Sequence, residues 1–109
     1  MGGNIRGVIQ VKTTAPNAIG EQVETWADVQ TLKGWLDLSG GEARYNAYQA
    51  KIQDSSHIFI CDYVPLDQRI TNENSRMLIN GKHYDVMLID NPMELNAHLE
   101  IFLKFTGGQ

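Results

Sequence analysis

Three histidines, His57, His83 and His98, are the side chains of this sequence best suited to bind a metal ion or to transfer a proton. No two of them stand at a spacing typical of metal ligands, and the chain contains one cysteine, Cys61, so it cannot supply a thiolate pair. We therefore expect no metal site and no intrachain disulfide. Cys61 lies in an apolar run, which predicts a buried thiol rather than a nucleophile.

A second possible chemistry is acid–base catalysis by Asp85 or Asp90 with the nearby His83. Solvated carboxylates at strand ends are far commoner than catalytic ones, so this grouping is weak support for an active site. The sequence contains no glycine-rich phosphate loop and no serine nucleophile elbow. The expectation is a protein that is not an enzyme and carries no cofactor.

Composition narrows the possible partners. The 109 residues suit one domain, residues 1–109, and the formal net charge is -4, with 9 Lys and Arg against 13 Asp and Glu. Proteins that bind duplex nucleic acid gain most of their affinity from cationic side chains, so this balance argues against that class. No apolar stretch approaches the roughly 20 residues that a membrane-spanning helix needs, and we expect folding in the cytosol without a membrane partner.

The elements that position these side chains are predicted to be strands. Residues 5–13 alternate between apolar and polar side chains, and residues 14–22 contain turn formers that predict a long surface loop. Residues 24–38 form a second long strand, in which Ala27 and Val29 are out of phase with Leu32 and Leu36. A one-residue bulge near Gln30 would bring both sets to the core.

Further strands are expected at residues 57–63, 76–79, 82–90 and 98–105. The Asn80-Gly81 pair between two of them is a strong hairpin signal, because both central positions of a type I′ turn need positive φ. The fold class is therefore mainly β, a small closed β-barrel of about six strands. The side chains expected to share one core are Ile9, Val11, Leu36, Ile58, Ile60, Val86, Leu88, Leu99, Ile101 and Leu103.

Two aromatic residues, Trp35 and Phe102, fall on the otherwise polar faces of their strands. A large aromatic in such a position either covers a neighbouring loop or contacts another subunit, and both alternatives stay open.

Residues 39–55 interrupt the strand pattern with the one predicted helix. Ser39 and Glu42 have capping-box spacing, and Tyr45, Tyr48 and Ile52 recur along one helix face. The apolar stripe is thin and glycines stand in the first turn, so an isolated helix of this length would be marginal. We expect a short helix or a mobile excursion after the second strand.

The order and spacing of these motifs resemble the head-tail joining proteins of tailed bacteriophages, the head-completion or stopper family of siphophages. The resemblance is carried by residues 24–29, 38–42, 57–60, 75–86 and 99–101. It covers most of the chain.

The resemblance implies a non-enzymatic virion protein that is assembled in the host cytoplasm and lies at the head-tail interface. It implies a homo-oligomeric ring, about twelve-fold, that binds below the phage portal and adaptor ring after DNA packaging and meets tail-completion proteins. It further implies that residues 39–55 close the channel and touch packaged DNA without sequence specificity, which gives the candidate residues Ser39, Gly40, Gly41, Glu42, Arg44, Tyr45, Tyr48, Lys51 and Gln53.

Two alternatives remain. A tail-terminator or neck protein would have a similar architecture, and the sequence does not separate it from a stopper. An OB-like nucleic-acid-binding barrel also places a helix between strands of a small closed sheet, and Trp35, Tyr45 and Tyr48 would then be stacking platforms. The acidic net charge makes this second alternative the weaker one.

Overall fold

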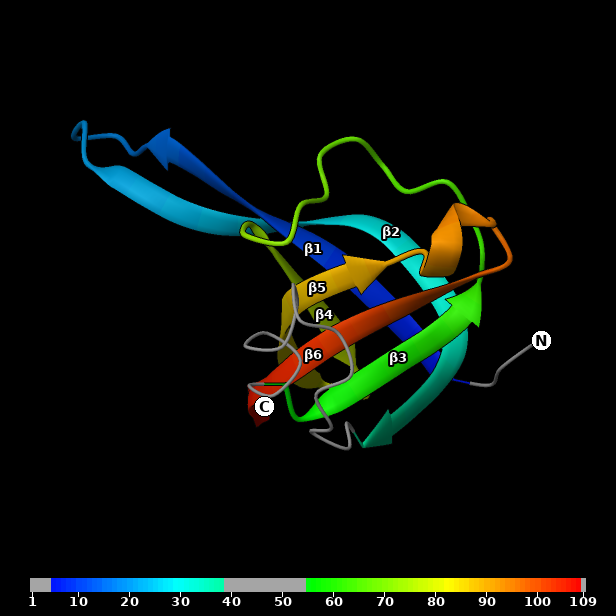
Figure 1. The fold of residues 1–109 in the computed structure, drawn as a ribbon. Coiled ribbons are helices and arrows are strands. Elements are labelled where there is room, and N and C mark those ends of the chain that lie inside the picture. Colours follow the sequence, from blue (N-terminus) through cyan, green and yellow to red (C-terminus); the bar gives the residue numbers. More distant parts are fainter. Residues whose placement is uncertain (1–4, 39–54, 109) are drawn as a thin grey trace.

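The structure, a computed structural model, describes residues 5–38 and 55–108, and these residues form six strands and one 3-10 helix (Figure 1). The elements are β1 (Ile5–Pro16), β2 (Gln22–Leu38), β3 (His57–Asp62), β4 (Ser75–Ile79), β5 (Lys82–Asp90), η2 (Pro92–Glu94) and β6 (His98–Gly108). The excursion predicted after the second strand lies outside the described residues, except for Ser55.

The six strands form one antiparallel sheet that closes on itself in the order β1-β2-β3-β6-β5-β4. Closure comes from β4, which pairs with β1 from Gly7 to Val11. The prediction of a mainly β, closed barrel of about six strands is confirmed. The hairpin between β4 and β5 is confirmed as well, because Asn80 and Gly81 have φ angles of 52° and 78°, as a type I′ turn requires.

The barrel interior is filled by apolar side chains from all six strands. Phe59, Met77 and Ile101 are completely buried at its centre. The full cluster contains Ile9, Leu32, Phe59, Cys61, Met77, Ile79, Tyr84, Val86, Leu99, Ile101 and Leu103. Seven of the predicted core residues are buried, namely Ile9, Val11, Val86, Leu88, Leu99, Ile101 and Leu103. Five of these belong to the cluster, all except Val11 and Leu88, and Leu36 packs against it while partly exposed.

The predicted core face of β3 is wrong. Phe59 and Cys61 face the interior, whereas Ile58 and Ile60 lie on the outer wall and are only partly buried. Both faces of this strand are apolar, so periodicity could not choose between them. The pairing decides the face, because Phe59 stands between Leu36 of β2 and Ile101 of β6.

Leu88 was also assigned to the common core, and the structure places it elsewhere. The pairing of β5 with β6 shifts between Val86 and Leu88, so Val86 pairs with Leu103 while Leu88 pairs with Phe102. This irregularity turns Leu88 to the outer wall. There it is buried in a separate cluster with Phe102, against which Ile58 and Met87 pack.

The bulge predicted near Gln30 is present, but the prediction that it turns Ala27 toward the core is wrong. Ile9 pairs with Gln30 and Gln10 pairs with Asp28, which leaves Val29 as the extra residue. Ala27, however, is exposed. The hairpin leaves the barrel beyond the bulge instead of turning more side chains into the core.

Residues 12–28 form a two-stranded arm that projects from the barrel (Figure 1) and lengthens the molecule to 48 Å, against 28 Å in the other two directions. The predicted loop at residues 14–22 is therefore shorter than expected, since β1 continues to Pro16 and β2 begins at Gln22, which leaves residues 17–21 as the turn. The turn is tight because the Asn17 side-chain oxygen accepts hydrogen bonds from the backbone N–H groups of Ile19 and Glu21, at 3.0 and 2.9 Å.

Substitutions on β3 test its inward and outward faces. Phe59→Ala should lower the free energy of unfolding by about 3–5 kcal/mol, because it leaves a cavity where an aromatic side chain was fully buried. The matched change Ile60→Ala, on the outer wall, should have a clearly smaller effect. Urea unfolding measures both, and the reverse ranking would show that the register of β3 is wrong.

Candidate functional site

The residues predicted to close a channel lie almost entirely outside the part of the chain that the structure describes. This applies to Ser39, Gly40, Gly41, Glu42, Arg44, Tyr45, Tyr48, Lys51 and Gln53. Their role stays a prediction. The described surface offers two other features, the outer wall of β2 and β3 and the arm.

Trp35 lies on the outer wall of the barrel with 45% of its surface exposed, and it pairs with the outward-facing Ile60 of β3. Phe102 differs, because it is 7% exposed and belongs to the small cluster on the outer wall. Trp35 therefore exposes an aromatic surface, whereas Phe102 exposes little. A subunit interface at either residue stays a prediction.

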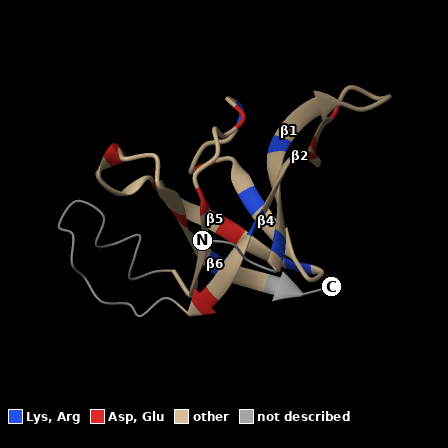
Figure 2. Cartoon of the chain, turned by 90° about the vertical axis from the view of Figure 1, so that its right-hand side faces the viewer, with Lys and Arg blue, Asp and Glu red and all other residues tan. Residues whose placement is uncertain are grey.

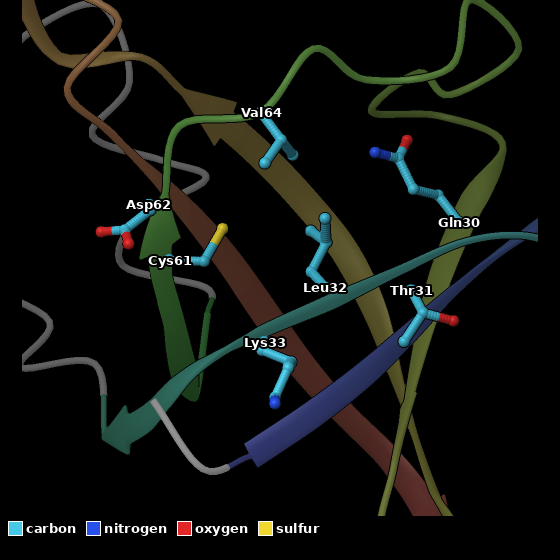
Figure 3. A pocket seen from close by; sticks show the side chains of 7 residues that line it. All are labelled: Gln30, Thr31, Leu32, Lys33, Cys61, Asp62 and Val64. Carbon is cyan, nitrogen blue, oxygen red and sulfur yellow. The ribbon is translucent and has the colours of Figure 1, made fainter. Parts of the chain in front are cut away.

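The pairing of β2 with β3 ends at Gly34 and Cys61. Where the two strands separate, the barrel wall has a depression of about 290 Å³ (Figure 3). Leu32, Cys61 and Val64 point toward one another in it, and the remaining lining comes from Gln30, Thr31, Lys33 and Asp62. Gln30 spans the gap, because its amide donates to the Pro65 carbonyl at 3.1 Å and its side-chain oxygen accepts from the Asp67 N–H at 2.8 Å.

The chemistry of this depression does not include an activated thiol. Burial, together with the neighbouring Asp62 carboxylate, raises the pKa of the Cys61 thiol to about 11, so the thiol is protonated at neutral pH. Cys61 is a buried core residue, as the sequence predicted.

The histidines are spread over three strands. His57 packs its ring against Tyr84, 5.1 Å between centroids, and His98 lies 3.1 Å from the Glu100 carboxylate. Burial and the Glu100 carboxylate raise the pKa of Asp90. Among residues 5–38 and 55–108, no group of three or more His, Cys, Asp or Glu side chains is arranged to hold a metal ion.

A row of polar side chains braces the arm where it leaves the barrel. Arg76, Gln10 and Asp28 stand side by side on β4, β1 and β2. The Gln10 amide donates to Asp28 at 2.7 Å, and the Gln10 side-chain oxygen accepts from Arg76 Nε at 2.7 Å. The Arg76 guanidinium also lies over the Trp26 ring, 4.2 Å from its centroid. These contacts join the base of the arm to the barrel wall.

The arm itself is solvent-exposed and unequal on its two faces. One face carries Lys12 on β1 and Glu24 and Asp28 on β2, with 3.7 Å between the Lys12 amine and Glu24. Figure 2 shows the basic and acidic positions along the chain. The opposite face carries only uncharged side chains, and at the tip Ile19 is 78% exposed. An exposed ribbon of this kind is suited to contact another protein.

The fold and these surfaces define a small closed antiparallel barrel with a projecting arm, a class of protein suited to assembly. A family model, described as phage head completion protein, matches residues 4–104, and the chain belongs to this family. Membership gives it a structural role in the phage head, as a virion component that interacts with other phage head or tail proteins.

A solved structure supports the fold. Protein SF1141 from Shigella flexneri 2a, known from a solution structure, is similar with a TM-score of 0.66 and 22% sequence identity. The similarity covers 95% of this chain and 93% of that one. No curated protein matches the sequence significantly. None of the described helices has the length and apolar character needed to cross a membrane.

Removal of the glutamine in the bracing row should destabilise the protein. Gln10→Ala deletes hydrogen bonds to two charged side chains, and such bonds contribute about 1.5–3 kcal/mol each, so we expect a loss of that order in the free energy of unfolding. Gln22→Ala, at an exposed position on the same arm, is the matched control and should change the free energy by less than about 0.5 kcal/mol. Equal effects in urea unfolding would show that the row does not stabilise the fold.

Proposed function

We propose that this protein is a structural component of the head-tail connector, which binds below the portal and adaptor ring after DNA packaging, closes the channel and provides the site of tail attachment. The observation that carries the proposal is the family match, because it spans the arm and nearly the whole barrel rather than a short motif. The role is structural and not catalytic.

The surface described above supports assembly with other proteins. Trp35 is an exposed aromatic on the barrel wall, and Trp is among the residues that most often anchor interfaces. The partners we propose are neighbouring copies in a ring of about twelve, the portal or adaptor above, and tail-completion proteins below. The ring is built in the host cytoplasm and becomes part of the virion.

Channel closure is assigned to residues 39–55, which connect β2 to β3. This assignment rests on the family resemblance. The segment would touch packaged DNA without reading its sequence, and the net charge of -4 supports a lining that does not grip a passing polyanion.

The isolated chain should be monomeric or only weakly associated, and should form its ring when it docks on a partner. A protein that formed rings spontaneously would compete with ordered assembly, and the wall offers few exposed aromatic anchors. Sedimentation velocity at micromolar concentration measures the state of the pure protein, and addition of the connector should produce the ring. A stable twelve-fold ring without partners would contradict this expectation. A tight dimer would instead favour the alternative of an OB-like nucleic-acid-binding barrel.

Replacement of residues 41–53 by a short Gly-Ser linker tests channel closure. The strand pairing from Gly34 to Leu38 is untouched, so the barrel should still form, which circular dichroism and urea unfolding will check. In particles that depend on this protein, heads should still join tails but should lose packaged DNA, measured as nuclease-sensitive DNA per particle.

A substitution in the exposed loop before β4, Gln68→Ala, is the control and should keep both joining and DNA retention. If the linker variant instead fails to join heads to tails, the segment is an adhesive surface and the stopper role is misassigned. Full DNA retention with normal joining would also contradict channel closure.

A further inference from the structure

The arm has two strand edges with no strand partner in the described structure. β2 pairs with β3 only from Gly34 to Leu38, so its edge over residues 22–33 pairs with no other strand. β1 pairs with β4 only from Gly7 to Val11, and beyond the bond from the Lys12 N–H to the Asn74 carbonyl its edge is open from Thr13 to Pro16. Open edges are templates for pairing with another chain.

The devices that usually protect such edges lie at the two ends of the arm, apart from the charged side chains, which are confined to one of its faces. Pro16, which lacks an N–H, stands only at the end of β1, and the bulge at Val29 lies at the base of the arm. Between these points β2 contains Val23, Thr25 and Trp26, residue types that favour strands. The arm therefore keeps an edge that can accept a further strand.

The uncharged face of the arm adds to this suitability. Thr13 pairs with Thr25 and Ala15 pairs with Val23, and the two threonine hydroxyls are 2.9 Å apart. Because these side chains are short, a strand that pairs with the edge can place its own side chains beside them on this face without displacing a long side chain.

The charged face of the arm, together with Pro16, decides which strand edges of two copies can pair. If two β2 edges met, Glu24 and Asp28 would lie beside the same acidic residues of the other copy. If two β1 edges met over the open residues Thr13 to Pro16, Pro16 of both copies would stand in the contact, and neither proline has an N–H to donate. β1 against β2 places only one such proline in the contact. It also brings Lys12, which borders the open β1 edge, near the acidic side chains of the next copy, and opposite charges on neighbouring strands stabilise a sheet whereas like charges destabilise it.

We propose that a second copy of this chain occupies the open edge, with β1 of one arm paired antiparallel to β2 of the next. The contact deepens the ring of the proposed function and rests on it. Because the two contacting surfaces differ, the contact is heterologous, and repetition of it produces a closed ring when the rotation between copies allows closure.

The open β1 edge is short, which makes the contact weak between free copies. Four residues of strand span about 13 Å, and such an edge buries far less than the roughly 800 Å² per partner of a stable complex. A scaffold that gathers many copies is therefore needed to populate the contact fully, in keeping with a free chain that is mainly monomeric.

Disulfide trapping between two single-site variants detects the weak contact. Ala15→Cys on β1 is mixed with Val23→Cys, Thr25→Cys or Ala27→Cys on β2, all on the uncharged face. The native Cys61 does not interfere, because it is buried and its pKa of about 11 keeps the thiol protonated. At high protein concentration, at least one mixed pair should form covalent heterodimer about tenfold faster than Ala15→Cys mixed with Gln68→Cys, because paired strands raise the local thiol concentration.

Charge reversal tests whether Lys12 of one copy lies near Glu24 of the next. Lys12→Glu in the Ala15→Cys variant should slow trapping about two- to fivefold, the effect expected of an exposed ion pair. The change also removes the Lys12–Glu24 ion pair inside the same copy, so restoration of the rate by Glu24→Lys in the other copy is the result that identifies a contact between copies. Circular dichroism of each variant shows that the barrel is intact.

Trapping of all mixed pairs at the Gln68→Cys rate would overturn the proposal. Faster trapping of Ala15→Cys with itself would also overturn it, in favour of two β1 edges. The DNA-retention experiment is read separately: lost retention with no trapping leaves the stopper role and removes the edge contact, whereas trapping with full retention leaves a self-associating arm and removes the stopper role.

Discussion

Closure of the sheet through the pairing of β4 with β1 is the constraint on which the rest of the structure depends. A closed sheet needs two neighbours for every strand, and here it supplies them only over the lengths that the shorter strands allow. β4 is five residues long and β3 six, whereas β1 and β2 have 12 and 17. The surplus of the two long strands must leave the barrel, and it does so as the arm.

The same constraint divides the molecule into a barrel with a buried core and an arm without one. Inside the closed part, cross-strand rows such as Leu36, Phe59 and Ile101 fill the interior, and these buried apolar side chains provide most of the stabilisation. Outside it, a two-stranded ribbon has no core and would be marginal alone. The row of Arg76, Gln10 and Asp28 compensates at the base of the arm, where three strands are still side by side.

Membership of the phage head completion family and this division into barrel and arm both indicate a structural role. A phage head completion protein interacts with other phage head or tail proteins, and the barrel with its braced, exposed arm separates a stable core from exposed surfaces that are free to make such contacts. The buried thiol of Cys61 packs in the barrel core, and the His57 ring packs against the rings of Tyr84 and Phe105.

The sequence by itself determined the β class, the turn at Asn80 and Gly81, and the position of the bulge near Gln30, because each depends on local periodicity or on the φ angles of one or two residues. Only the tertiary structure decided which face of β3 is inside, since Phe59 and Ile60 are both apolar and the pairing with β2 and β6 makes the choice. It also decided where the long hairpin leaves the barrel, because that point is fixed by the lengths of β3 and β4, strands far away in the sequence.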